Sequence, residues 1–284
     1  MKVFYTPKMV AHAGGDSPSP HKPPLVVQAW RDAGIPLAIE EPDPVTVDDF
    51  ALAHDREHVE EILSLRMANG FGNTDSEVAA SLPYTTGSMV DAARWAIRNS
   101  SAVASPCSGF HHARWDCASM FCTFNGLMVT ACKLRAEGLV KKVAILDCDQ
   151  HYGNGTDEII DRLNARAWAH HITATKGYKR DSALLDRLPE IIAGFTDCDV
   201  VLYQAGADPH VDDPYGGYLT TEQLAQRDRI VFSECRRCRL PVAWNLAGGY
   251  QDDLSKVIEV HVNTALACEA EYPVPIDRPR SSLQ

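Results

Sequence analysis

Apolar runs and amphipathic stretches alternate along the chain. The apolar runs, rich in Val, Ile and Leu, occupy residues 2–6, 36–41, 102–106, 142–147, 199–204 and 241–246. Between them lie amphipathic stretches, of which residues 55–69 and 125–138 are two examples. Strands of this composition that alternate with helices are typical of a parallel sheet covered by helices on both faces. The pattern therefore predicts an α/β fold with three layers.

The same pattern predicts one domain. No repeat, low-complexity tract or Gly/Ser-rich linker interrupts residues 1–272, and a chain of 284 residues with 45% hydrophobic content can bury a large core. Residues 273–284 are rich in proline and charge and predict a loose C-terminal tail.

Composition and charge narrow the class of partner. A net charge of −11 argues against a general nucleic-acid binder, which would need a basic surface. No segment approaches the roughly 18 apolar residues of a membrane span, and the N-terminus lacks the apolar segment of a signal peptide. The nine cysteines are odd in number and scattered, which favours reduced thiols in a cytoplasmic protein. We expect no nucleic-acid or membrane partner, while a homo-oligomer is compatible with the sequence.

Four of the predicted strands end in segments with unusual polar chemistry. These segments are residues 105–113, 147–156, 204–210 and 246–250. Because ligands gather beyond the carboxyl ends of strands in open α/β sheets, we expect the four segments to meet. Their convergence indicates a functional site more strongly than any single motif does.

The segment ILDCDQHYGNG contains the strongest indication of a metal. Asp147, Asp149 and His151 alternate, so in an extended strand they would emerge on one face and require a compensating cation. Asp208 follows the small residues of AGAD at the end of another strand. Asp149, His151 and Asp208 would supply two carboxylates and an imidazole and leave one position for water, as in catalytic zinc sites. A solvated strand end would explain the alternating residues of this segment if they stood alone, and a helix N-cap would explain Asp208 if it stood alone. Taken together, the residues favour a metal site.

Paired histidines occur twice in the sequence. His111–His112 follows Gly109 and Phe110, which predict a tight turn that presents both rings to a pocket, where histidine can serve as general base and acid. His170–His171 has no Gly-rich turn or acidic partner in its segment, so we interpret that pair as structural. The C-x-x-C formed by Cys235 and Cys238 has no second pair and lies in a basic, helix-like stretch, so we interpret it as structural too.

The segments SGFHHA, MFCTFNG, ILDCDQHYGNGT, AGADPHVDDPYGGYLT and LAGGY resemble, in this order, motifs of the histone deacetylase and acetylpolyamine amidohydrolase family. The resemblance covers about residues 80–255, and residues 53–63 resemble an earlier segment of the family. It implies the arginase–deacetylase fold, with a mostly parallel sheet of about eight strands.

Carried over by motif, the resemblance assigns roles to the polar residues. Asp149, His151 and Asp208 become the ligands of one catalytic zinc ion per chain, and His111 and His112 become the acid–base pair beside it. A structural potassium ion near Asp147 is a further cofactor that the family implies.

Three more residues match positions that orient the catalytic groups. Asp147 resembles the partner of the first histidine, and Asn154 the partner of the second. A neutral Asn raises the pKa of His112 less than a carboxylate would, which favours a neutral base near pH 7. Tyr250 matches the tyrosine that donates a hydrogen bond to the carbonyl and the developing oxyanion.

The substrate-binding positions follow the family less closely. Phe121 fits the aromatic position of the substrate tunnel, and Phe110 and Gly249 are further predicted substrate-binding residues. Met120 stands where the family usually has Gly, which predicts a narrower wall. The second tunnel aromatic has only Tyr178 as a candidate.

The resemblance implies a zinc-dependent amidohydrolase that removes an acetyl (acyl) group from an amine. Acetylated polyamines, small acetylated metabolites and acetyl-lysine are candidate substrates, and residues 76–87 offer no clear acidic residue for gripping a peptide. One alternative is a non-catalytic module that binds acyl-amines and regulates a partner. A binuclear-manganese ureohydrolase is disfavoured, because Gly153 stands where a second metal would need a carboxylate.

Overall fold

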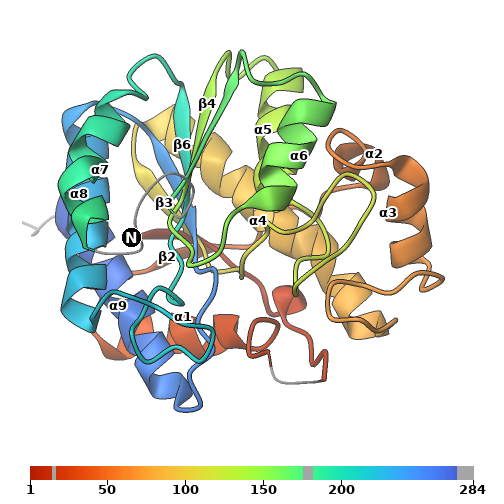
Figure 1. The fold of residues 1–284 in the computed structure, drawn as a ribbon, viewed down its shortest axis with the longest axis horizontal. Coiled ribbons are helices and arrows are strands. Elements are labelled where there is room, and N and C mark those ends of the chain that lie inside the picture. Colours follow the sequence, from red (N-terminus) through yellow and green to blue (C-terminus); the bar gives the residue numbers. More distant parts are fainter. Residues whose placement is uncertain (15–16, 175–181, 274–284) are drawn as a thin grey trace, which may run out of the picture.

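Seven parallel strands form the centre of the computed structural model, which describes residues 1–14, 17–174 and 182–273 (Figure 1). The strands are β1 (Lys2–Phe4), β2 (Ala38–Glu40), β3 (Ala102–Ser105), β4 (Val143–Asp147), β5 (Ala169–Thr173), β6 (Val200–Gln204) and β7 (Val242–Asn245). Their order in the sheet is β2-β1-β3-β7-β6-β4-β5. The six predicted apolar runs each contain one strand. Tyr178 and the predicted tail from residue 274 onward lie outside the described residues.

Helices cover both faces of the sheet, so the α/β class and its three layers are confirmed. The helices are the 3₁₀ turn η1 (Pro7–Met9) and α1 (Lys22–Asp32), α2 (Val47–Phe50), α3 (Arg56–Leu63), α4 (Ser76–Asn99), α5 (Gly126–Ala136), α6 (Asn154–Arg162), α7 (Ala183–Ala193), α8 (Thr221–Arg237) and α9 (Leu254–Glu271). α1, α7, α8 and α9 pack on one face, and α2 to α6 pack on the other. Within the described part of the chain, no helix has both the length and the apolar character needed to cross a bilayer.

Strand residues divide between the two faces in strict alternation. In β4, Val143 and Ile145 belong to the core under α2–α6, whereas Ala144 and Leu146 belong to the core under α1 and α7–α9. Because both faces are covered, every residue of this strand is buried. The apolar composition of the run follows directly from this double burial.

The register of the four central strands positions the site. Ser105 pairs with Asn245, Asn245 with Gln204, and Gln204 with Asp147. The last residues of β3, β7, β6 and β4 therefore lie in one row across the sheet. All four following loops leave from the same edge, as the sequence predicts for the segments that carry the polar chemistry.

Candidate metal and catalytic centre

The loop after β4 turns sharply as soon as the strand ends. The strand stops at Asp147, whose Oδ1 accepts a hydrogen bond from Asp149 N (3.2 Å), and Asp149 Oδ1 accepts one from His151 N (2.9 Å). The strand alternation predicted through His151 is therefore wrong beyond Asp147, because these local hydrogen bonds replace the extended conformation. Asp149 and His151 line the pocket, whereas Asp147 is fully buried beside it.

Asp208, from the loop after β6, completes a compact trio with Asp149 and His151. His151 Nδ1 lies 3.2 Å from Asp149 Oδ1 and 3.0 Å from Asp208 Oδ2, and one donor atom from each residue lies within 4.8 Å of the others. Both carboxylates are buried, and burial together with the charge of Asp149 raises the pKa of Asp208 to about 7. This raised pKa indicates that the site is short of positive charge, which a divalent cation would supply. Two carboxylates and one imidazole with an open side fit a catalytic zinc ion.

Glycine lets the neighbouring loop approach this trio closely. A Cβ built on Gly248 would lie 2.3 Å from Asp208 Oδ1, and one on Gly206 would lie 2.7 Å from the Cα of Asp149. No larger residue fits at either position without moving the carboxylates.

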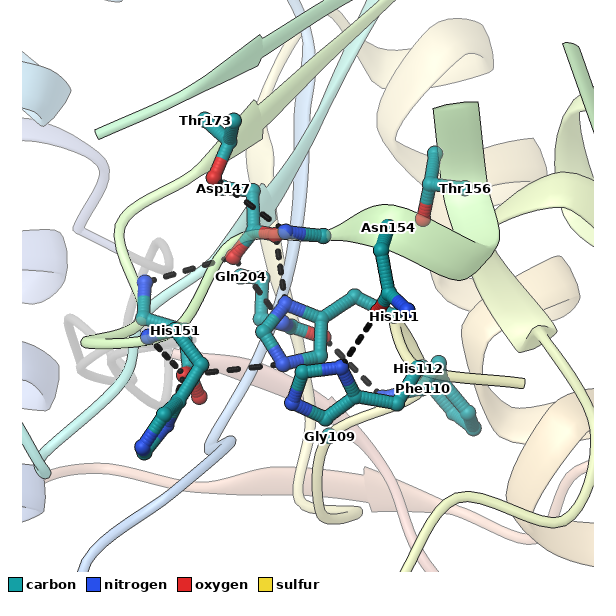
Figure 2. Close-up of polar contacts among 12 residues, drawn as sticks. Gly109, Phe110, His111, His112, Asp147, His151, Asn154, Thr156, Thr173 and Gln204 are labelled. Atoms are coloured by element: carbon teal, nitrogen blue, oxygen red, sulfur yellow. Dashed lines mark hydrogen bonds and ion pairs between the residues drawn. The ribbon is translucent and has the colours of Figure 1, made fainter. Parts of the chain in front are cut away.

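The paired histidines after β3 each rest on a different partner. His111 Nδ1 lies 2.6 Å from Asp147 Oδ2, and His112 Nδ1 lies 2.6 Å from Asn154 Oδ1 (Figure 2). Gln204 Nε2 donates to the other oxygen of Asp147 at 2.9 Å. With Nδ1–H donating to these oxygens, both rings keep Nε2 available on the side away from their partners.

The two rings have opposite electrostatic surroundings. Burial and the neighbouring His111 lower the pKa of His112 to about 4, so this ring is neutral at pH 7. Burial opposes the charged form of His111, but Asp147 and Asp149 outweigh it and raise its pKa to about 9. One ring can therefore accept a proton at neutral pH while the other carries one.

Tyr250 reaches the same pocket from the loop after β7. Its backbone N–H donates to Asp213 Oδ2 (2.8 Å), and burial, with the charges of Asp149 and Asp208, raises the pKa of its phenol. The phenol therefore remains a hydrogen-bond donor. Gly249 has φ +93° and packs against Val257. Of the two glycines before Tyr250, Gly248 lines the pocket, and Gly249 is not among the described residues that do.

Aromatic and apolar side chains form the wall of the pocket. Phe121 lines both this pocket and an adjoining cavity, whereas Phe110 lines only the adjoining one. Met120 lines the pocket with 55% of its surface exposed, and its φ of +46° places it in a backbone region that favours glycine. Tyr215, which the sequence reasoning missed, packs edge-on to Tyr250 at 4.9 Å between ring centroids. Its position in the Gly-rich DPYGGY segment after Asp208 was the available signal.

A buried lysine supports the Tyr250 loop and was also missed. Lys22, near the start of α1, is fully buried and donates from Nζ to the carbonyl oxygens of Ala247 (3.2 Å) and Gly248. Burial lowers its pKa to about 8, although nearby carboxylates oppose this shift. Nothing in the local sequence distinguishes Lys22 from a surface lysine, because its partners lie more than 200 positions away.

In the second histidine pair, His170–His171, one of the two rings has acidic neighbours. His171 Nδ1 lies 3.0 Å from Asp157 Oδ1, and its Nε2 lies 3.8 Å from Asp147 Oδ2. The interpretation that this pair lacks acidic partners is therefore wrong for His171, because both carboxylates come from other segments. His170 could form a second trio with Asp197 and Cys198, but Asp197 is exposed and paired with Lys142. Cys235 and Cys238 carry free thiols.

Comparisons with known proteins place this geometry in a family. The family model of the histone deacetylase domain matches residues 18–171 and 170–265. An uncharacterized protein of Picosynechococcus is 30% identical over 172 residues, which are 54% of this chain and 57% of that protein. Histone deacetylase 2 of Arabidopsis thaliana is 26% identical over 172 residues, which are 53% of this chain and 44% of that protein. The matches thus span about half the length of these curated relatives.

Two solved structures share the fold. Acetylpolyamine aminohydrolase from Burkholderia pseudomallei superposes with a TM-score of 0.75 at 19% identity, covering 95% of this chain and 99% of that one. The HDA15 HD domain superposes with a TM-score of 0.77, also at 19% identity, covering 96% and 91%. At this identity the similarity shows the arginase–deacetylase fold.

Proposed function

The chain belongs to the histone deacetylase family, and from that premise we propose that it is a zinc-dependent amidohydrolase that removes acetyl groups from amines. One observation carries the proposal. Asp149 and His151 of the trio line the same pocket as His111, His112 and Tyr250, and the third member, Asp208, lies buried against them.

The residues of the trio would hold one zinc ion, which when bound supplies Lewis-acid polarisation of the amide carbonyl and acidifies a water molecule. His112 is the general base of the proposal, because it is neutral at pH 7 and its Nδ1–H is engaged by Asn154. His111, held by Asp147 and protonated at neutral pH, is the group that gives a proton to the departing amine.

Tyr250 supplies the hydrogen bond to the carbonyl oxygen as negative charge develops there. Its raised pKa keeps the proton on the phenol throughout the reaction. The aromatic pair that it forms with Tyr215, and its contact with Phe121 at 5.8 Å between ring centroids, hold the ring over the pocket.

The pocket favours a small acetylated amine over a peptide. It is narrow, with a cavity of about 60 Å³, which suits a short acyl group. Among the described residues that line it, Asp149 is the only acidic one, and as a proposed zinc ligand it is not free to hold the backbone N–H groups of a peptide. We therefore propose acetylated polyamines or similarly small acetylated amines as the substrate class.

Release of acetate tests the proposed activity directly. Purified protein is incubated with an acetylated polyamine, an acetylated amino acid and an acetyl-lysine peptide, each with zinc, with chelator, and with zinc restored. We expect acetate from the small amines with zinc, loss of turnover with chelator, and recovery on restoration.

The result also separates the enzyme from a binding module. If zinc-loaded protein binds acetylated amines in calorimetry but releases no acetate from any of them, the chain is a regulatory binding module and the proposed activity is wrong. The ureohydrolase alternative fits poorly, because a Cβ on Gly153 would lie 2.5 Å from Asp147 Oδ2.

A further inference from the structure

His171 on β5 lies between two carboxylates that come from different elements. Its side chain is almost fully buried (1% exposed), with Nδ1 3.0 Å from Asp157 Oδ1 on α6 and Nε2 3.8 Å from Asp147 Oδ2 at the end of β4. The same oxygen of Asp147 bonds His111 Nδ1. A continuous row of alternating charge therefore runs from the pocket through His111, Asp147, His171 and Asp157.

We propose that His171 is a positioning residue of the catalytic centre, whose imidazole, anchored by Asp157, holds the Asp147 carboxylate where it orients His111. The inference rests on the proposed function, because it concerns the partner of the proposed acid.

The surroundings of the ring are built for this contact. A Cβ on Gly153 would lie 2.5 Å from Asp147 Oδ2 and 3.0 Å from His171 Nε2, so only glycine lets the carboxylate and the ring come together here. Strand register contributes as well, because His171 pairs with Ile145, two residues before Asp147 on the neighbouring strand. A side chain from β5 on this face thus reaches the end of β4.

Charge decides which form of the ring fits between the two carboxylates. A neutral ring that donates from Nδ1 to Asp157 would turn the lone pair of Nε2 towards Asp147. A doubly protonated ring presents N–H groups to both. Burial opposes that form, but the Asp147 and Asp157 carboxylates outweigh it and raise the pKa of His171.

The other groups around Asp157 complete the anchor. The hydroxyl of Tyr152 donates to Asp157 Oδ2, and Arg166 Nη1 lies 4.0 Å from Asp157 Oδ1. These contacts hold Asp157 from the loop before α6 and from the segment after it. The Asp157 carboxylate therefore has a fixed position and can orient the imidazole of His171.

The test compares His171→Gln with His170→Gln in the zinc-loaded protein. His170 is the neighbouring residue of β5 and points to the opposite face of the sheet, so it is the matched control. For His171→Gln we expect kcat on the best acetylated amine to fall about tenfold, with KM and zinc content unchanged. For His170→Gln we expect wild-type values of all three.

A spectroscopic readout makes the test independent of turnover. In protein labelled with ¹⁵N-histidine, the Nδ1–H resonance of His111, assigned by its loss in Asp147→Asn, should shift in His171→Gln and stay in place in His170→Gln. If the wild type releases no acetate from any substrate, the proposed function fails, and this resonance still decides the role of His171.

An unshifted His111 resonance together with wild-type kcat in His171→Gln would overturn the proposal. So would a fall in kcat that zinc loss accounts for, or an equal fall in His170→Gln. If His171→Gln does not fold, Asp157→Asn replaces it, with the same shift of the His111 resonance expected and its absence counting against the anchor.

Discussion

A single hydroxyl separates the proposed role of Tyr250 from a packing role. Tyr250→Phe keeps the ring and its contacts with Tyr215 and Phe121 but removes the donor. We expect kcat to fall by about 10²–10³, or about 3–4 kcal/mol, with zinc content and melting temperature unchanged. Steady-state kinetics, elemental analysis and thermal unfolding measure the three quantities. A kcat near that of wild type would remove Tyr250 from the mechanism.

In the proposed mechanism, the partner of His112 sets the pH range of activity. In Asn154→Asp a carboxylate replaces the amide oxygen that lies 2.6 Å from His112 Nδ1, so it stabilises the protonated ring and raises its pKa from about 4. The base must be neutral to act, and activity falls as pH drops through its pKa. The acid limb of the kcat/KM profile should therefore move to higher pH. Superimposable profiles for variant and wild type would show that residue 154 does not control the base.

At the residue scale, the sequence predicts groups with a distinctive local setting and misses those defined by distant partners. Tandem histidines after a Gly–Phe turn and carboxylates after an apolar run are visible in a short window. The role of Lys22 is evident only from its contacts with Ala247 and Gly248. The role of His171 is likewise evident only from its contacts with Asp147 and Asp157. Burial of a charged side chain is decided by tertiary packing, which a short window does not contain.

At the element scale, Lys22 connects α1 to the loop between β7 and α9, and its titration should be visible in stability. Its folded pKa is about 8, below the ordinary value of 10.5, so between these values the unfolded chain binds more protons. The free energy of unfolding should therefore rise with pH across this window, by about 3 kcal/mol at most.

Lys22→Met provides the comparison, because methionine does not titrate while other groups still do. Denaturant unfolding of the zinc-free proteins from pH 7.5 to 10.5 should show wild type gaining stability relative to the variant. Parallel curves for the two proteins would show that Lys22 is not held with a lowered pKa.

Elements with uniform composition are predictable from the sequence, and elements that combine polar and apolar residues are not. Five of the six apolar runs hold strands that are mostly or fully buried between the two helical layers, whereas β2 lies at the edge of the sheet and exposes Ala38 and Glu40. β5 was missed because its sequence, AHHIT, places two histidines in an edge strand. The alternation expected from Asp147 to His151 is absent for a related reason, since the side chains of Asp147 and Asp149 each accept a hydrogen bond from the backbone N–H two residues further on.

At the scale of the whole molecule, the metal should couple activity to stability. Asp208→Ala removes one of three donors, and we expect zinc and turnover to be lost together. At 100 times its dissociation constant, zinc should stabilise wild type by about 2.7 kcal/mol and should leave the variant unaffected. Elemental analysis and melting temperatures with and without zinc measure both effects.

The number of metal ions per chain distinguishes the proposed zinc amidohydrolase from a binuclear ureohydrolase of the same fold. One zinc ion per wild-type chain is expected. Two stoichiometric metals per chain would favour a binuclear ureohydrolase, and a zinc-dependent rise in melting temperature that survives in Asp208→Ala would place the ion elsewhere.

The position of β3 between β1 and β7 has a consequence for biosynthesis. β1 and β2 precede β3 in the chain, but β7 follows it by roughly 140 residues. At about 5–20 residues per second, the ribosome needs on the order of ten seconds to deliver that partner. Throughout this interval one edge of β3 presents unpaired backbone groups to any neighbouring nascent chain. Yield of active protein should therefore depend on how well chaperones shield the half-built sheet until its last strand emerges.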